Sequence, residues 1–332
     1  YGIQALIQIH KIEKGLLVLS VLQAILEAVF PYIELVCAAR IIDLLIEANF
    51  AKAVQITVVL AIFIFLGGLL LDALSSIHTY KSDRAHRKML RRVNQKAMEL
   101  DYEEMENTEL LHKISDSVYS MNHIGGYNVF LGYYNKLLKN ATQVLISFAA
   151  VLRLSTLNPS VGYQGWVSWV SSPAVSFCIL MLVTVGNFLI SNEIAARFKR
   201  YSSSGYQEKM KVERKLNYFA DKVFMNGEMG KEIFDMLELI IQKHSMALND
   251  SLRFYNKYYD DAAKNQETLH TITQGLCTLA AYVVVICKVL SGAASIGELS
   301  QYIGSIVLLN QAIRMCLTVN QKIALQTGFV KT

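Results

Sequence analysis

Long apolar runs without charge are the dominant pattern along this chain. The clearest extends from Pro173 to Ile190, about 18 residues, which is enough to cross most of a bilayer as a helix. The sequence then turns basic with no further proline, beginning at Arg197 and Lys199. This pattern predicts one helix that leaves the membrane and continues far into water.

The same apolar character recurs along the rest of the chain. We therefore expect an all-α membrane protein with six spans, at about 15–46, 53–77, 137–154, 173–190, 268–290 and 299–317. The first span is predicted to be broken at Phe30-Pro31, because proline removes a helical hydrogen bond. Residues 1–14 predict a short amphipathic helix on the membrane surface.

Two long polar segments join the spans in pairs, at 78–136 and 191–267. Each begins as a basic continuation of a span, reverses direction, and returns as a polar helix, so each predicts a helical hairpin. An extension of 25–30 residues would reach about 40 Å. The segment 155–172 is the only long one of loop-like composition. It holds both tryptophans, Trp166 and Trp169, which suit a lipid–water interface.

Composition supports a membrane protein. The chain has 332 residues, 53% hydrophobic and 18% charged, and only three prolines. The two hairpins are rich in lysine and arginine, whereas the turns at 47–52, 155–172 and 291–298 contain only Lys52. The positive-inside rule then places the hairpins and both termini in the cytoplasm, with the spans in the plasma membrane. The basic hairpin faces are interpreted as solvated surfaces and topology signals rather than as a nucleic-acid site.

Candidate chemistry is sparse. The five cysteines lie in apolar runs with no CxxC pair, and no HxxxH spacing occurs, so we expect neither a disulfide framework nor a metal site. His10 and Glu13 form one isolated HxxE pair on a polar helix face. No phosphate loop of the form G-x-x-x-x-G-K-[ST] is present, and no catalytic residue is identified in this segment.

Three local sequences carry a family resemblance. They are Met105–Asp116 (MENTELLHKISD), Glu213–Phe219 (ERKLNYF) followed by Gly230–Ile233 (GKEI), and Ala294–Leu299 (ASIGEL). Together with the six-span pattern and the two hairpins, they resemble the transmembrane domain of ABC exporters of the multidrug, lipid or peptide type, in a bacterial half-transporter. The resemblance covers essentially the whole chain as a single transmembrane domain.

The resemblance implies a mechanism and partners. Helices four and five would swap to a second half-transporter, identical or different, and alternating access would move an amphiphilic drug, lipid or peptide outward. A nucleotide-binding domain, which would bind ATP and Mg²⁺, is expected after residue 332, and the parent protein would be an ATP-hydrolysing translocase. Two coupling helices would contact such domains. They would include Glu106, Asn107, Thr108, Glu109 and Leu110 in the first hairpin, and Tyr218, Phe219, Asp221, Phe224 and Asn226 in the second.

Polar residues inside the spans are candidate substrate contacts, because ionisable groups in a membrane usually face a protein interior or a wet cavity. These positions are Gln23, Glu27 and Glu34 in the first span, His270 and Gln274 in the fifth, and Asn310, Gln311, Arg314 and Thr318 in the sixth. The alternative is an ion pair between Glu27 or Glu34 and Arg314 that locks the bundle. Asp72, Arg40 and Asp43 are interpreted as structural or interfacial.

Other functions stay open at this point. The chain could be a catalytically silent half of a heterodimeric exporter, or a six-helix membrane receptor or regulator that transports nothing. A secondary transporter fits less well, since such proteins usually combine broken helices with short cytoplasmic loops.

Overall fold

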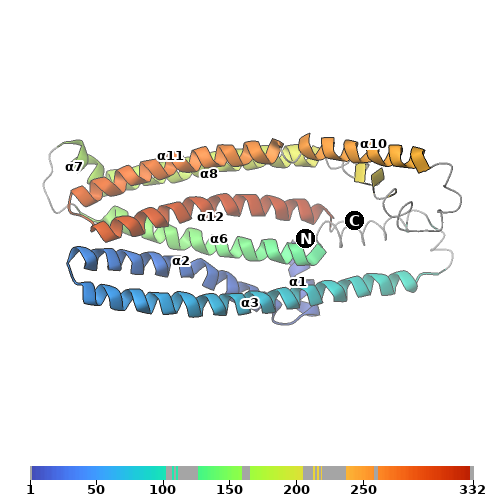
Figure 1. The fold of residues 1–332 in the computed structure, drawn as a ribbon, viewed down its shortest axis with the longest axis horizontal. Coiled ribbons are helices and arrows are strands. Elements are labelled where there is room, and N and C mark those ends of the chain that lie inside the picture. The colour runs from blue at the N-terminus through green and yellow to red at the C-terminus, as the bar shows by residue number, and fades with distance from the viewer. Residues whose placement is uncertain are drawn as a thin grey trace. The chain divides into compact units, whose positions relative to one another are not determined.

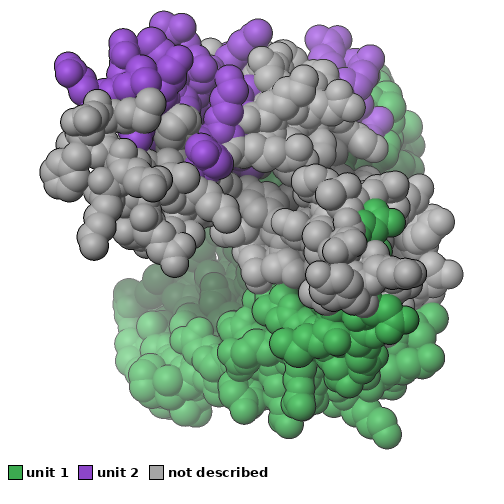
Figure 2. Space-filling view, turned by 90° about the vertical axis from the view of Figure 1, so that its right-hand side faces the viewer, with its two compact units in different colours: residues 1–189, 274–332 green, residues 190–273 purple. Residues whose placement is uncertain are grey.

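The structure is a computed structural model, and it describes residues 2–101, 126–158, 165–204, 237–257 and 261–329. It also describes the separate positions Asn107, Leu110, Val212, Glu213, Lys215, Leu216 and Tyr218. Every regular element in these residues is a helix (Figure 1). Two compact units are present, unit 1 with residues 1–189 and 274–332, and unit 2 with residues 190–273 (Figure 2). Unit 2 corresponds closely to the second predicted hairpin, 191–267.

The helices follow the order α1 (Gly2–Ile12), α2 (Leu16–Ile46), α3 (Phe50–Met98), α6 (Gly126–Thr156), α7 (Trp166–Ser171), α8 (Pro173–Ser204), α10 (Leu237–Tyr255), α11 (Asp261–Leu290) and α12 (Ile296–Phe329). Six of them, α2, α3, α6, α8, α11 and α12, are long and apolar enough to cross a membrane. The six predicted spans are therefore confirmed as candidate spans. The fold and composition together define an all-α, multi-pass membrane protein.

Among its described residues, unit 1 has a large buried apolar cluster and a smaller one around Ile9 and Leu16. Within this unit α2, α3, α6 and α12 lie side by side (Figure 1). Fully buried side chains such as Leu154, Val285, Tyr302 and Leu309 come from α6, α11 and α12 and pack together. These helices hold apolar residues on several faces, as expected for helices surrounded by both protein and lipid.

The helix α3 continues well beyond its apolar part, as the sequence predicts. It is 49 residues long, which corresponds to about 70 Å at 1.5 Å per residue, whereas a bilayer core is about 30 Å thick. Its most apolar window has no buried residue in this chain, and side chains such as Val59, Phe65 and Leu66 are exposed. In a membrane this face would contact lipid or another subunit. The basic continuation of the fourth span is also helical, because α8 extends to Ser204.

Two sequence predictions are wrong. The first span is not broken at Phe30-Pro31, because α2 is one helix of 31 residues with Pro31 inside it. Proline removes only one helical hydrogen bond, and an apolar helix in a bundle keeps the others. The second correction concerns 155–172, where the short helix α7 interrupts the predicted loop. Trp166 and Trp169 are both exposed on α7, as expected for interfacial tryptophans.

The start of α12 is fixed against α2 by a capping network. Ser295 and Glu298 form a reciprocal capping box, with the Glu298 N–H donating to Ser295 Oγ (3.0 Å) and the Ser295 N–H donating to Glu298 Oε2 (3.1 Å). Asp43 of α2 accepts from the Ser295 hydroxyl and from the Gly297 N–H, both at 2.8 Å. The structural role predicted for Asp43 is therefore confirmed.

Glycines allow this close approach of α12 to α2. A Cβ on Gly297 would lie 2.1 Å from the Ala39 carbonyl oxygen, and one on Gly304 would lie 2.4 Å from Leu35 Cδ2. Gly297 and Gly304 are seven residues apart, two turns along one face of α12. Small residues on such a face let two membrane helices pack backbone to backbone.

Candidate functional site

A line of polar contacts runs inside unit 1 between α2, α3 and α6, and we call it the polar seam. Its members are Ser20, Gln23 and Glu27 of α2, His78 of α3 and Lys139 of α6. Ser20 Oγ lies 2.8 Å from His78 Nε2, and Gln23 Nε2 donates to Glu27 Oε1 at 2.8 Å. Lys139 Nζ forms an ion pair with Glu27 Oε2 at 3.0 Å. The seam thus joins a carboxylate, an ammonium and an imidazole within a largely apolar bundle.

The seam continues along α2 toward the middle of α6. Tyr32 is buried, and its hydroxyl donates to the Gln143 carbonyl oxygen at 3.1 Å and contacts the Ser147 hydroxyl. Such interhelical hydrogen bonds stabilise membrane bundles by roughly 0.5–2 kcal/mol each. The α2–α6 interface therefore combines a charged end at Glu27 with a neutral hydrogen-bonded part at Tyr32.

One atom of the seam has no partner. Gln23 is 4% exposed, and its Oε1 accepts no hydrogen bond from any described residue. A buried acceptor without a donor costs roughly 1–3 kcal/mol, so a water molecule or a polar ligand at this position would be stabilised. Asn310 shares this property, because its Nδ2 is also buried and has no hydrogen-bond partner among the described residues. Gln23 and Asn310 are therefore the predicted cavity residues with a direct reason to bind a polar group.

The other predicted cavity positions fall into several environments. Glu27 belongs to the seam and pairs with Lys139, a residue that the sequence analysis did not select. Asn310 is buried in α12, and its Oδ1 accepts from Asn187 Nδ2 of α8 at 2.9 Å. Glu34, Gln274, Arg314 and Thr318 are half-buried, and Gln311 is exposed. His270 is also buried, and it belongs to unit 2, whereas the other predicted cavity residues belong to unit 1.

The predicted coupling helices lie almost entirely outside the described residues. Of the ten positions, only Asn107, Leu110 and Tyr218 are described. The Asn107 side-chain Oδ1 accepts from the Leu110 N–H at 3.4 Å, which is the pattern of a helix N-cap. Tyr218 is exposed. The coupling role stays a prediction.

A buried lysine is the most informative residue that the sequence analysis missed. Lys288 lies in α11 with its side chain fully buried, and its ammonium donates to the carbonyl oxygens of Ser155 (3.3 Å) and Leu157 (2.6 Å). The Ser155 carbonyl lies in the last turn of α6 and the Leu157 carbonyl directly follows the helix, where backbone acceptors lack helical partners. The signal was available, since a lone charge within the apolar run 268–290 needs a partner. His78 was missed because it lies one residue beyond the predicted span 53–77. Lys139 was missed although it lies within the predicted span 137–154, near its start.

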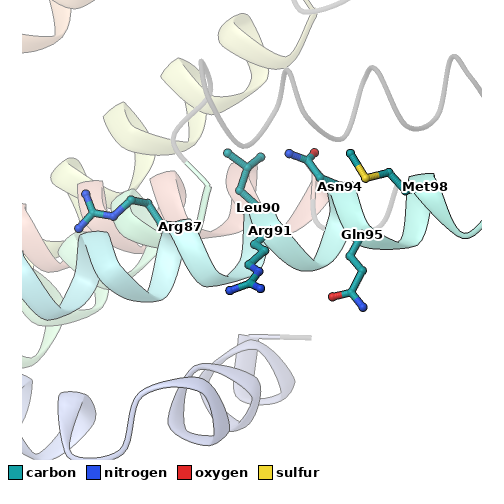
Figure 3. A pocket seen from close by; sticks show the side chains of 6 residues that line it. All are labelled: Arg87, Leu90, Arg91, Asn94, Gln95 and Met98. Carbon is teal, nitrogen blue, oxygen red and sulfur yellow. The ribbon is translucent and has the colours of Figure 1, made fainter.

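Surface depressions are also present among the described residues, apart from the seam. One follows the basic part of α3 and has a volume of about 460 Å³, with Arg87, Leu90, Arg91, Asn94, Gln95 and Met98 as its lining. All six come from one helix, and Figure 3 shows Leu90 and Asn94 pointing to the side opposite Arg91 and Gln95. These side chains do not converge on one point. The second depression, between α2, α6 and α12, contains charged residues from three helices.

Metal chemistry has no support in the described part of the chain, where no group of three His, Cys, Asp or Glu side chains could hold an ion. All five cysteines are free. The sequence analysis interprets them as small buried apolar residues, and Cys277 and Cys287 are buried, Cys37 and Cys316 are half-buried, and Cys178 is exposed. No family model matches the chain, and no curated protein matches it. The fold and the site therefore define the class of multi-pass membrane protein, and the function is argued from the site.

Proposed function

We propose that this chain is the membrane-spanning subunit of an ATP-driven exporter of the ABC type. It would move a hydrophobic or amphiphilic substrate, such as a drug, a lipid or a peptide, out of the cell by alternating access. It would work with a second half-transporter and with ATPase domains that bind ATP and Mg²⁺. Those domains would belong to the same gene product or to a separate subunit.

The observation that carries the proposal is the length of α3 beyond its apolar part. The predicted span ends at Ile77, yet the helix continues for about 20 residues to Met98 with seven lysine or arginine residues. A rigid helix of that kind can transmit a movement between the membrane and a cytoplasmic ATPase domain some 30 Å away. Secondary transporters instead typically place broken helices at a binding site near the bilayer midplane.

The polar seam supplies a second argument. Exporters of amphiphilic compounds need polar groups inside the bundle that can bind a substrate and exchange partners. Glu27 carries a negative charge that Lys139 now neutralises, and Gln23 offers an unused acceptor beside it. A cationic or zwitterionic substrate could take the place of Lys139 at Glu27. This favours substrates that carry an amine or a quaternary ammonium group.

ATP hydrolysis by the full-length gene product, purified in nanodiscs, tests the proposal. We expect basal hydrolysis that rises with cationic amphiphiles or peptides, in the protein alone or after co-expression with a neighbouring subunit. Activity that requires the neighbour would identify a heterodimer. Absence of hydrolysis in both preparations, with the protein folded, would contradict the proposal and leave a receptor or regulator.

A further inference from the structure

The depression between α2, α6 and α12, which we call the α2–α12 groove, has the properties of a ligand site. It has a volume of about 610 Å³. Its polar lining includes Arg40, Asp43 and Glu47 from α2, Arg153 from α6, and Glu298 and Gln301 from α12. The groove is separate from the polar seam, whose residues do not line it.

Two guanidinium groups in this groove are available to a ligand. Arg40 and Arg153 are exposed, and neither guanidinium group forms a hydrogen bond or an ion pair with a described residue. They come from different helices but line the same depression. Guanidinium groups bind phosphate oxygens in bidentate geometry, which lysine cannot reproduce.

The acidic residues of the groove are mostly engaged. Asp43 uses both carboxylate oxygens to hold the start of α12, and Glu298 Oε2 accepts from the Ser295 N–H. Glu47 is exposed, and its carboxylate forms no hydrogen bond or ion pair with a described residue. Three carboxylates nearby disfavour a doubly charged anion such as free phosphate. A phosphodiester with one negative charge, joined to an amine that could approach Glu47, fits this balance better.

The groove also has an apolar wall at a membrane boundary. Val36, Ile46 and Ile296 line it and are exposed. Ile46 is the last residue of α2 and Ile296 is the first of α12, so the groove lies where two candidate spans end. A ligand with a charged head and an apolar tail would satisfy both parts at this depth.

We propose that the α2–α12 groove binds a zwitterionic phospholipid headgroup. Arg40 and Arg153 hold the phosphodiester, and Glu47 faces the amine. The part of the acyl chains nearest the headgroup lies along Val36, Ile46 and Ile296. This site is independent of the transported substrate and of the polar seam. A lipid bound there would contact the end of α2, the end of α6 and the start of α12 together.

Native mass spectrometry of the purified full-length protein in detergent tests this site directly. The probe is a synthetic phosphatidylethanolamine, titrated while bound adducts are counted. We expect one tight lipid adduct whose affinity falls at least about tenfold in Arg40→Gln/Arg153→Gln, as loss of charge-assisted hydrogen bonds predicts. The matched control is Arg197→Gln, because Arg197 pairs with Glu193 on α8 and does not line the groove. Equal affinity in the double variant and the control would overturn the proposal.

Two additional experiments test whether the groove is a simple anion site and whether the guanidinium geometry matters. Inorganic phosphate at the same concentration should not displace the lipid, and displacement would show a simple anion site and overturn the lipid assignment. If the glutamine double variant does not fold, Arg40→Lys/Arg153→Lys keeps both charges but loses the bidentate geometry. It should bind the lipid more weakly than the wild type, and unchanged affinity would contradict the guanidinium contacts. None of these readouts depends on ATP hydrolysis.

Discussion

At the scale of single residues, the polar groups of unit 1 are explained by the backbone atoms that they satisfy. Lys288 supplies donors to the end of α6, and Asp43 supplies acceptors to the start of α12. Both act at helix ends, where backbone groups have no helical partner and the bilayer offers no water. Charged residues in the apolar spans are therefore not all candidates for substrate binding.

Lys288→Met should destabilise the protein by about 1–3 kcal/mol, because two carbonyl oxygens lose their donor in a buried site. Thermal unfolding in detergent measures the effect as a lower midpoint. Lys264→Met is the matched control, since Lys264 is exposed on the same helix. A midpoint equal in both variants would mean that the buried ammonium contributes nothing to the end of α6.

Gly297→Ala should separate α12 from α2, because the new methyl group would meet the Ala39 carbonyl oxygen and the Asp43 side chain. Overpacking of this kind typically costs about 1–3 kcal/mol, and here it would also weaken the Asp43 cap. Gly68→Ala on α3 is the control, since nothing lies within 4 Å of its Cβ position and alanine favours a helix. Thermal unfolding should rank Gly68→Ala at or above wild type and Gly297→Ala below it. The reverse order would contradict the close packing of α2 and α12.

At the scale of elements, the contact between the end of α1 and α3 depends on charge. Lys88 Nζ donates to Glu13 Oε2 (2.5 Å) and to the Ile12 carbonyl oxygen (3.3 Å), and Arg84 lies 3.8 Å from Glu13 Oε1. The hydrogen bond from Lys88 holds the pKa of the Glu13 carboxyl below its ordinary value of 4.5. The contact therefore stabilises the fold fully above pH 4.5 and is lost as the pH falls through the lower, folded-state pKa.

A spin label at Ile7, which is exposed on α1, should report this loss as increased mobility below pH 4.5. Glu13→Gln cannot form the ion pairs, so its label should be mobile at every pH. A label that stays immobile in Glu13→Gln at neutral pH would show that apolar packing alone holds α1, through residues such as Ile9 and Leu16.

The sequence predicts the elements well because an apolar run of 18 residues or more has few alternatives to a membrane helix. It predicts α3 past its apolar part because no proline or glycine interrupts the basic residues after His78. It does not reveal how a polar side chain is paired, since Glu27–Lys139 and Ser20–His78 join residues far apart along the chain. It also cannot show that Pro31 stays within α2, because that depends on packing rather than on local preference.

At the scale of the whole molecule, the distribution of basic residues predicts which ends of the helices face the cytoplasm. In intact cells, a membrane-impermeant maleimide should label Asn158→Cys, at the end of α6, from outside. Arg92→Cys, on the basic part of α3, should react only after the cells are permeabilised. Both positions are exposed, so access to the thiol depends on the side of the membrane alone. The opposite labelling pattern would contradict the positive-inside assignment.

The measurement that tests the central proposal most directly is ATP-driven transport into inside-out vesicles that contain the full-length protein and any partner subunit. A fluorescent cationic amphiphile serves as the probe, and Glu27→Gln is compared with Glu238→Gln, which alters an exposed carboxylate outside the polar seam and the groove. We predict ATP-dependent accumulation in wild type and in Glu238→Gln, and at least about tenfold less efficient uptake in Glu27→Gln, because a charge-assisted contact is lost. Accumulation that is independent of ATP, or absent for every amphiphile and peptide tried, would contradict the exporter assignment.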